Sequence, residues 1–406
     1  RGLNNDGHDF INDAISCGAH CIICESVPKD IQKKITYIQV EDSLIALSSL
    51  SSIFFYNPSS KIKLIGITGT NGKTSTAYYL ASLFRKLNYK VGLISTIEYQ
   101  IDSHTTLSTH TTPNAIIINQ LLSKMVQAGC DYCFMEVSSH GISQKRITGL
   151  DFDVAVFTNI SRDHLDYHIT FDHYLNTKKN FFDNLSSQAT SIINIDDSYG
   201  SLMVNDSKSK KVFYSVKQKS HYNATLLQSE LGGLVINIDG TEISTSIAGD
   251  FNLYNILATY AVAIEMGQKK RRVLKFLSSI LPVPGRFKTI QSKNGIFGIV
   301  DYAHTPDALN QVISSVSNFC NLIQDLIIVV GCGGNRDQGK RADMGKIASE
   351  NSKMSIFTSD NPRLEDPKSI ISDMLQGVED DTQNKVKTIK KRSKNRQRSI
   401  HRCIHA

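Results

Sequence analysis

The sequence predicts an α/β protein whose largest domain is built on a parallel sheet. Between residues 64 and 360, short apolar runs alternate with segments of helical periodicity. The runs are apolar throughout rather than at every second position, which is typical of strands that helices cover on both faces. A glycine-rich turn also joins the first run directly to a helical segment. These three observations favour parallel strands connected by helices.

Turns and changes of composition divide the chain into four predicted segments, 1–58, 59–283, 284–378 and 379–406. An Asn-Pro turn ends the first segment, and a Pro-Val-Pro-Gly break ends the second. The fourth is basic and of low complexity, with few apolar residues, so we expect it to be disordered.

Each of the first three segments has its own predicted elements. The first has a strand at 20–25 between helical segments at 8–19 and 42–55. The second has five strands and a long closing helix, at 64–68, 91–96, 133–139, 154–160, 191–196 and 249–267. The third has strands that alternate with helices, at 298–303, 325–331 and 354–360. The order of elements therefore predicts two successive α/β domains after a small N-terminal piece.

The net charge of +7 does not by itself indicate a nucleic-acid-binding protein. From Thr382 onward there are nine Lys or Arg and no acid, so residues 1–381 carry 36 basic and 38 acidic side chains. The body is almost neutral, and we do not expect nucleic acid as a partner. No apolar run approaches the roughly 20 residues that span a bilayer, so we expect no membrane segment either.

The cysteines favour a reducing compartment. The chain has eight, without regular spacing, and we expect a cytoplasmic location. Two CxxC pairs, Cys21/Cys24 and Cys130/Cys133, lie 106 residues apart, each beside an apolar run. A zinc site needs four converging ligands. We therefore interpret these cysteines as small buried apolar residues.

The loop TGTNGKT at 68–74 has the features of a phosphate-binding turn. Gly69 and Gly72 let backbone amides face an anion, Lys73 supplies positive charge, and Thr74 offers a hydroxyl to Mg²⁺ at the start of a helix. Its spacing, GxxGK[ST], is shorter than the common GxxxxGK[ST]. The preceding strand and following helix are the context that such a loop requires.

This loop resembles the ATP loop of the Mur ligases and the folylpolyglutamate synthases. Further segments resemble the Mur ligases in the same order: STHTTPNA (108–115), MEVSSHG (135–141), FTNISRDHLDYH (157–168), GDFNLYN (249–255), PGR (284–286), DYAHTPDAL (301–309), GCGGNRDQGKR (331–341) and SDNPR (359–363). The resemblance covers about residues 1–378. It implies a partial N-terminal UDP-sugar-binding domain, a central ATP-binding domain with a parallel sheet, and an incomplete, Rossmann-like C-terminal domain that binds an amino acid.

The resemblance also implies an activity, that of the branch adding the third residue of the peptidoglycan stem peptide. Such a ligase uses ATP and Mg²⁺ to join meso-diaminopimelate to the D-Glu carboxylate of UDP-MurNAc-L-Ala-D-Glu through an acyl phosphate. This chemistry needs positioning and charge neutralisation more than a protein nucleophile. We expect a cytoplasmic monomer. Two alternatives stay open, a folylpolyglutamate synthase-like ligase and an inactive, truncated nucleotide-binding protein.

Five residues match the family's catalytic and metal-binding positions. The resemblance implies that Lys73 faces the β- and γ-phosphates, and that Thr74 and Glu136 bind Mg²⁺. It also implies that His164 and a CO₂-carbamylated Lys178 bind a second Mg²⁺. The alternatives are a surface carboxylate at a strand end for Glu136 and a solvated helix lysine for Lys178.

The resemblance further implies which residues contact ATP. They come from the loop, from one face of the closing helix and from beyond the break between domains: Gly69, Thr70, Asn71, Gly72, Lys73, Thr74, Ser75, Asn252, Asn255, Arg286 and Asp301. Arg286 and Asp301 would clamp the nucleotide when the domains close and exclude water from the acyl phosphate. The alternative for Arg286 is a surface salt bridge.

For the UDP-sugar peptide, the resemblance implies a set of amide, hydroxyl and guanidinium groups. The set is Asn4, Asn5, His110, Thr111, Thr112, Ser138, Gln144 and Arg146. His110 departs from the family, which has Asn at this position.

The amine site is implied by GGNR and SDNPR, with Arg336, Asp360, Asn361, Pro362 and Arg363 as its residues. In this family DNPR goes with meso-diaminopimelate, whose distal carboxylate pairs with Arg363. A planar guanidinium can hold a carboxylate through two parallel hydrogen bonds. Lysine would instead bring an ammonium near Arg363, and like charges repel. The alternative is an ordinary Asn-Pro turn.

The resemblance ends near Gly377, before the GKGHE motif that completes the amino-acid site in this family. The chain also begins without Met. Both features favour truncation at both ends. We therefore expect the C-terminal domain to lack its last strands and to expose a sheet edge.

Overall fold

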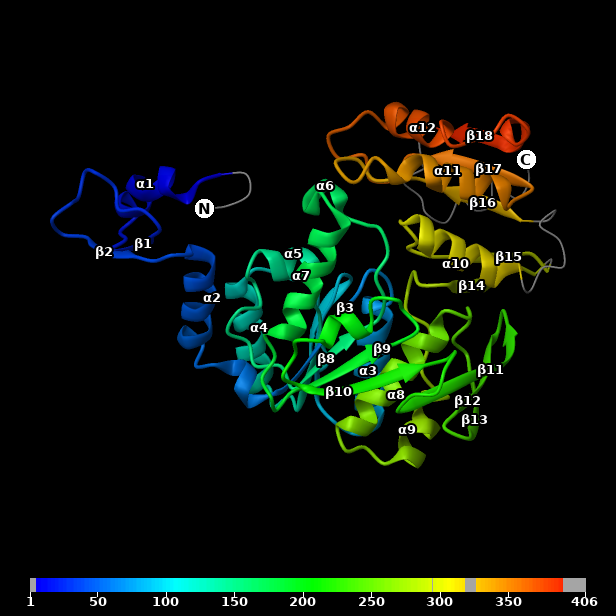
Figure 1. Cartoon of the computed structure of the whole chain (residues 1–406), viewed down its shortest axis with the longest axis horizontal. Coiled ribbons are helices and arrows are strands. Elements are labelled where there is room, and N and C mark those ends of the chain that lie inside the picture. Colours follow the sequence, from blue (N-terminus) through cyan, green and yellow to red (C-terminus); the bar gives the residue numbers. More distant parts are fainter. Residues whose placement is uncertain (1–4, 294, 318–325, 390–406) are drawn as a thin grey trace.

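The computed structural model describes residues 5–293, 295–317 and 326–389, which form three α/β units in chain order (Figure 1). The small N-terminal unit stands away from the central domain and is joined to it through α2 (Ser43–Phe54). The C-terminal domain lies on the other side of the central domain. The predicted fold class is confirmed.

Among its described residues, the N-terminal unit has a core of three buried side chains, Ile11, Ile22 and Cys24. Its elements before α2 are a 3-10 helix (Gly7–Phe10), α1 (Ile11–Ser16), β1 (Cys21–Cys24) and β2 (Thr36–Gln39). β1 pairs with β2 in parallel and alternates between exposed and buried residues, so Cys21 is exposed while Cys24 is buried. The prediction that all four CxxC cysteines are buried is therefore wrong for Cys21.

The central domain is built on one large sheet. In chain order, the first half of the domain contains a 3-10 helix (Pro58–Lys61), β3 (Lys63–Thr68), α3 (Lys73–Lys86), β4 (Val91–Ile94), β5 (Glu98–Ile101), β6 (His104–Leu107), α4 (Ala115–Gln127), β7 (Tyr132–Glu136), α5 (Ser139–Ser143), β8 (Val154–Phe157), α6 (Leu165–His168) and α7 (Phe171–Asp183). Then follow β9 (Thr190–Asn194), a 3-10 helix (Ser201–Val204), β10 (Lys210–Ser215), β11 (Tyr222–Glu230), β12 (Gly233–Ile238), β13 (Thr241–Thr245), α8 (Asn252–Glu265) and α9 (Lys270–Leu277).

The sheet has 11 strands in the order β13-β12-β11-β10-β9-β8-β3-β7-β4-β5-β6. The strands from β4 to β11 in this order pair in parallel, as predicted. Both edges differ from the prediction, because β5 with β6 and β12 with β13 form antiparallel hairpins. Strand β12 alternates buried and half-buried residues, so it is covered on one face only, as antiparallel edge strands often are.

Helices cover both faces of the parallel strands. Successive residues of a strand point to opposite faces, and in β3 Leu64 belongs to one hydrophobic core whereas Ile65 belongs to the other. Helices α3 and α8 pack on the face of Ile65, and α4 and α7 pack on the face of Leu64. Continuous burial on both faces explains why these strands are apolar throughout.

The C-terminal domain has a described sheet of three parallel strands, in the order β16-β17-β18. Its elements are the hairpin β14 (Lys288–Gln291) and β15 (Phe297–Val300), α10 (Pro306–Ser317), β16 (Ile327–Val330), α11 (Lys340–Glu350), β17 (Met354–Thr358), α12 (Pro367–Leu375), a 3-10 helix (Gln383–Lys385) and β18 (Val386–Ile389). β18 lies within the segment predicted to be a disordered tail. That prediction is wrong for 386–389, because backbone pairing with β17 orders a strand whose side chains are mostly exposed. Residues 390–406 lie outside the described part.

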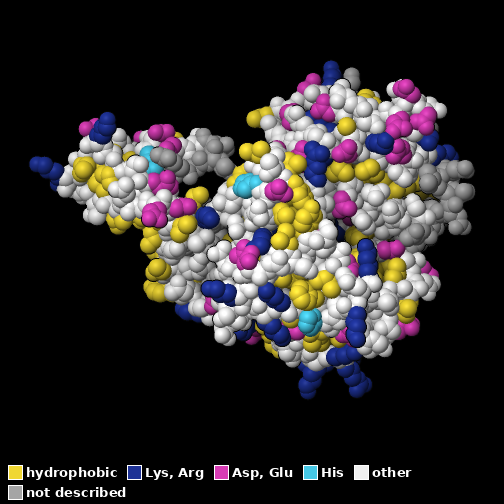
Figure 2. All heavy atoms as spheres, viewed as in Figure 1, with side chains coloured by type: hydrophobic (Ala, Val, Ile, Leu, Met, Phe, Trp, Pro, Cys, Tyr) yellow, Lys and Arg dark blue, Asp and Glu magenta, His cyan; other side chains and the backbone are white. Residues whose placement is uncertain are grey.

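Apolar side chains gather on the surface over α2, beside the N-terminal unit (Figure 2). Leu47, Leu50, Ile53 and Phe54 on this helix are exposed. Across the described ranges, the structure contains no helix with the length and apolar character needed to cross a membrane.

Candidate active site

The loop between β3 and α3 depends on two glycines. Gly69 has φ +149°, and a Cβ there would lie 1.9 Å from Oγ1 of Thr158. Gly72 has φ +86°, and its Cβ would lie 2.4 Å from Oδ1 of Asn255. Residues with a side chain rarely adopt these conformations, and neither position has room for one. The glycines therefore let the loop turn sharply at the carboxyl end of the sheet.

Two lysines meet at one carbonyl of this loop. Nζ of Lys73 donates to the carbonyl oxygens of Gly69 (2.8 Å) and Thr70 (2.9 Å), and Nζ of Lys178, on α7, donates to Gly69 O (2.8 Å). Burial lowers the pKa of Lys73, and burial followed by the charge of Lys73 lowers the pKa of Lys178 well below its ordinary value. Lys178 is 1% exposed, so its interpretation as a solvated helix lysine is wrong.

A buried carboxylate lies beside the start of α3. Glu136, the last residue of β7, is fully buried, which rules out a surface carboxylate. Its Oε2 accepts from the hydroxyls of Thr74 (3.0 Å) and Thr96 (3.1 Å), and its Oε1 accepts from the Thr96 amide (2.7 Å). Nη2 of the half-buried Arg286 donates to the same Thr74 hydroxyl (3.1 Å), so Arg286 is not simply part of a surface pair.

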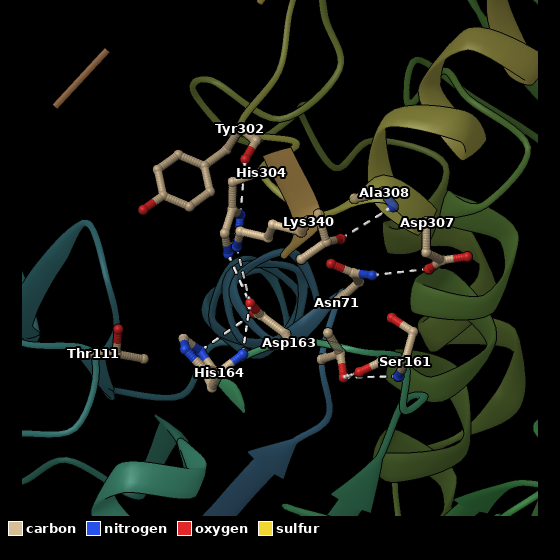
Figure 3. Close-up of polar contacts among 12 residues, drawn as sticks. Asn71, Thr111, Ser161, Asp163, His164, Tyr302, His304, Asp307, Ala308 and Lys340 are labelled. Carbon is tan, nitrogen blue, oxygen red and sulfur yellow. Dashed lines mark hydrogen bonds and ion pairs between the residues drawn. The ribbon is translucent and has the colours of Figure 1, made fainter. Parts of the chain in front are cut away.

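Asp163 has contacts with side chains of both domains (Figure 3). Its Oδ1 accepts from Nζ of Lys340 on α11 (3.0 Å), and its Oδ2 lies 3.3 Å from Nε2 of His164 and 3.6 Å from Nε2 of His304. Burial raises the pKa of Asp163, but the His304 hydrogen bond and the charge of Lys340 hold it well below the usual range. Burial lowers the pKa of His164 to about 2, so its imidazole is neutral.

Further contacts join the C-terminal domain to the loop. Nδ2 of Asn71 donates to Oδ2 of Asp307 at the start of α10 (3.1 Å), as Figure 3 shows. The guanidinium carbon of Arg286 lies 4.2 Å from the centre of the Tyr302 ring. Asp301 accepts from two backbone amides of the domain connection, those of Phe287 and Ala303 (2.7 Å each). Arg286 thus bonds across the domain boundary through Thr74, and the roles of Arg286 and Asp301 in clamping ATP stay predictions.

The structure places the two helix asparagines behind the loop. Asn252 accepts from the Tyr79 hydroxyl (3.2 Å) and donates to Ala248 O (2.7 Å), and Asn255 donates to Asn252 (2.9 Å). Both are buried. They support the loop by joining α8 to α3, and their contact with ATP stays a prediction.

Most residues predicted for the UDP-sugar peptide lie next to Glu136. Thr112 donates to Glu136 O (2.8 Å) and accepts from the Ser138 amide (2.9 Å), and Thr111 accepts from Thr96 (3.0 Å). Arg146 donates to Thr112 O (2.5 Å) and to Oε1 of Gln144 (2.5 and 3.1 Å). His110 is exposed, Asn5 is exposed in the N-terminal unit, and Asn4 lies outside the described residues.

The residues predicted for the amine lie on two loops that leave neighbouring strands. Arg336 follows β16, and Asp360, Asn361, Pro362 and Arg363 follow β17. The side chains of Arg336 and Arg363 are exposed. Burial and then the charge of Arg336 lower the pKa of His140, in the central domain, to about 4.

Sequence reasoning missed several residues of this site. Asp163, His304 and Lys340 form its interdomain charge cluster, Thr96 holds Glu136, and Tyr174 donates to or accepts from Thr70 (2.9 Å) beneath Lys178. Three of them lie inside segments that resemble the family, in RDH, YAH and QGKR. Thr96 follows a predicted strand, but only the fold places it beside Glu136.

Comparison with known proteins agrees with this geometry. Residues 67–263 match the Mur ligase middle domain, and residues 285–403 match the Mur ligase glutamate ligase domain. The chain is 46% identical to a UDP-N-acetylmuramoyl-L-alanyl-D-glutamate–2,6-diaminopimelate ligase of Bacteroides fragilis, over 96% of this chain and 80% of that protein. It is 47% identical to the ligase of the same name from Cytophaga hutchinsonii, over 93% and 78%.

A solved structure of a UDP-N-acetylmuramoyl-L-alanyl-D-glutamate–2,6-diaminopimelate ligase is similar to the fold as well. It superposes with a TM-score of 0.69 at 30% identity, over 95% of this chain and 79% of that one. The family model for the C-terminal domain extends beyond Gly377, where the resemblance was expected to end. With two matched domains and relatives of this identity, the chain belongs to the Mur ligase family.

Proposed function

We propose that this chain is an ATP-dependent ligase that joins 2,6-diaminopimelate to the D-Glu carboxylate of UDP-N-acetylmuramoyl-L-alanyl-D-glutamate in peptidoglycan precursor synthesis. The observation that carries this proposal is the convergence of Lys73, Lys178 and Glu136 on one glycine loop. The two loops bearing Arg336 and Arg363 lie on the domain that covers it. Membership of the family and the names of its relatives support the same activity.

The reaction balances with ATP as the phosphoryl donor. A D-Glu carboxylate oxygen attacks the γ-phosphorus, the bond to ADP breaks, and an acyl phosphate forms. The amine of diaminopimelate then attacks the acyl carbon, and inorganic phosphate leaves. Lys73 would neutralise charge on the transferred group, while the Thr70 and Asn71 amides donate to Asn159 and hold the loop in place. Arg286, bonded to Thr74 across the domains, helps to exclude water while the acyl phosphate exists.

The donor set beside the loop fits Mg²⁺. The Thr74 hydroxyl and the buried Glu136 carboxylate are hard oxygen donors 3.0 Å apart, and Mg²⁺ commonly takes its other ligands from phosphate and water. No cluster of three or more His, Cys, Asp or Glu within the described ranges is arranged to hold a metal. When bound, Mg²⁺ would neutralise phosphate charge.

Lys178 fits carbamylation by CO₂. Only a neutral amine attacks CO₂, and burial together with Lys73 holds the pKa of Lys178 well below its ordinary value. The product is a carboxylate-like group, which adds two oxygen donors at this position. His164, kept neutral by burial, has the protonation state of a metal ligand. We propose that His164 and carbamylated Lys178 hold the second Mg²⁺.

The three units would divide the work. Residues 1–58 would contact the uridine end of the substrate through Asn4 and Asn5, residues 59–283 would hold ATP, and residues 284–378 with the strand that follows would hold the amino acid. We propose that Thr111, Thr112, Ser138, Gln144 and Arg146 bind the peptide end, because they form one polar network beside Glu136. We further propose a monomer that works in the cytoplasm.

The test is a ligase assay on the purified full chain. It is incubated with ATP, Mg²⁺ and UDP-MurNAc-L-Ala-D-Glu, with meso-diaminopimelate or L-lysine in parallel, while ADP release and product mass are followed. Product with diaminopimelate, and little with lysine, is expected. Product only with lysine, only with a folate substrate, or no ADP release from the folded chain would refute the proposal.

A further inference from the structure

The two loops predicted to hold the amino acid are packed tightly against each other. We call residues 331–336 and 359–365 the amino-acid loops. They leave the carboxyl ends of β16 and β17, which are parallel neighbours. The Gly334 amide donates to Asn361 O (2.9 Å), and a Cβ on Gly334 would lie 1.9 Å from Pro362 O. Neither loop can shift without the other.

Each loop also holds one residue in the left-handed region. Arg363 has φ +51° and Asn335 has φ +49°. Such conformations are uncommon in residues other than glycine, and they persist where surrounding contacts over-determine them. Here Nη1 of Arg363 donates to Gly334 O (2.7 Å), and Oδ1 of Asn335 accepts from the Leu364 amide (3.0 Å). The direction of Arg363 is thus set by contacts between the loops.

An ion pair between a buried arginine and a half-buried glutamate lies behind these contacts. The Arg341 side chain, at the start of α11, is 1% exposed, and its Nη2 lies 2.9 Å from Oε2 of Glu365. The other carboxylate oxygen of Glu365 accepts from the Asn335 amide. The hydrogen bond from the Asn335 amide, and then the one from Arg341, lower the pKa of Glu365. Glu365 therefore connects the buried Arg341 to both left-handed residues. It lies on the same loop as Arg363, and it accepts a hydrogen bond from the Asn335 amide.

Arg341 has a second partner that does not belong to the loops. Its Nη1 donates to Oδ2 of Asp373 on α12 (2.7 Å). The two carboxylates thus bind the same guanidinium at similar distances, yet only Glu365 also bonds an amino-acid loop. Removing Asp373 should therefore affect only the stability of the domain, whereas removing Glu365 should also affect the amino-acid loops.

We propose that Glu365 is a positioning residue that, held by Arg341, fixes Asn335 and Arg363 in the geometry that grips the distal carboxylate of the amino acid. The inference rests on the proposed function and names a residue set behind its amino-acid site. Because Arg363 recognises a carboxylate by a planar fork of donors, a small rotation of its loop weakens binding of diaminopimelate. ATP, which binds the central domain, is not affected.

Three variants of the full chain test the proposal: Glu365→Gln, Asp373→Asn and Asn335→Gly. Glu365→Gln and Asp373→Asn each remove one charged partner of Arg341. Asn335→Gly deletes the bond to the Leu364 amide with no backbone strain, since glycine accepts a positive φ. The measurements are KM for diaminopimelate, KM for ATP, kcat at saturating diaminopimelate, and the thermal midpoint.

We expect Glu365→Gln and Asn335→Gly to raise KM for diaminopimelate roughly tenfold or more, the size of effect that supporting hydrogen bonds have at other ligand sites. KM for ATP and kcat should stay near the wild-type values. Asp373→Asn should lower the thermal midpoint as Glu365→Gln does but leave KM for diaminopimelate near wild type.

An equal rise of KM in Glu365→Gln and Asp373→Asn would overturn the inference, because the pair would then only stabilise the domain. An unchanged KM in Asn335→Gly would overturn it as well, and this variant decides the matter if Glu365→Gln does not fold. Failure of the proposed function looks different. In that case the wild-type chain itself forms no product with diaminopimelate, and both the proposed function and the assignment of the amino-acid site are disproved.

Discussion

The ion pair between Lys340 and Asp163 allows a quantitative prediction about domain closure. The side chains are 7% and 3% exposed, and the ammonium lies 3.0 Å from the carboxylate. Lys340→Met keeps most of the apolar side chain but leaves Asp163 buried without its cation. Breaking a buried pair by removing one partner costs about 3–5 kcal/mol.

In the Lys340→Met variant, two histidines would still contact the Asp163 carboxylate and offset part of the cost of burying it. His304 and His164 lie 3.6 and 3.3 Å from Oδ2 of Asp163, so we take the lower limit of about 3 kcal/mol. Because Lys340 and Asp163 belong to different domains, the loss opposes closure rather than the folding of either domain. The expected result is a fall in kcat/KM of about 150-fold, with a nearly unchanged thermal midpoint.

A second pair across the same boundary provides the control. Arg162 and Asp337 lie 3.8 Å apart, and Arg162 is 51% exposed, so Arg162→Gln should cost no more than about 1 kcal/mol. A double-mutant cycle with Lys340→Met and Asp163→Asn should show a double variant much less impaired than the sum of the two single variants. The reasoning is refuted if Lys340→Met and Arg162→Gln lower kcat/KM equally, or if the cycle is additive.

Three further predictions concern the loop, the buried lysine and the amine site. Gly69→Ala should lower the free energy of unfolding by about 1–3 kcal/mol, because an added Cβ does not fit the loop. It should also abolish ATP binding as measured by titration calorimetry. Gly240→Ala, at a φ of +83° in open space, should leave ATP affinity intact, and loss in both variants would contradict this account. The pKa of Lys178 is well below its ordinary value, so the folded amine is neutral where the unfolded one is protonated. The free energy of unfolding should therefore fall as pH is lowered from about 10 toward the folded pKa, by about 1.4 kcal/mol per pH unit. Lys178→Met should remove this slope in CO₂-free urea titrations, and equal slopes would count against the shift. Arg363→Lys should raise KM for diaminopimelate more than about tenfold because a fork of donors is lost, while ATP affinity holds. Equal loss of both would disprove the role of Arg363.

The strands and the loop were predictable because their signals are local. An apolar run of five residues followed by glycines and a Gly-Lys-Thr predicts its own strand, turn and helix from neighbours in the chain. The edge hairpins were not predicted, since their alternating pattern is weaker than a continuous apolar run. β18 was missed because its order depends on pairing with β17 rather than on burial of its own side chains.

The sequence by itself determined the parallel strands predicted for the central domain, the glycine loop and part of the candidate site, because backbone conformation and apolar burial are encoded over short stretches. Only the tertiary structure decided how those residues meet. Lys178 reaches the carbonyl of Gly69 from 109 residues away, and Lys340 reaches Asp163 from 177 residues away. The lowered pKa of Lys178 and the interdomain ion pair follow from that packing, since desolvation and charge pairing depend on which distant groups share a site.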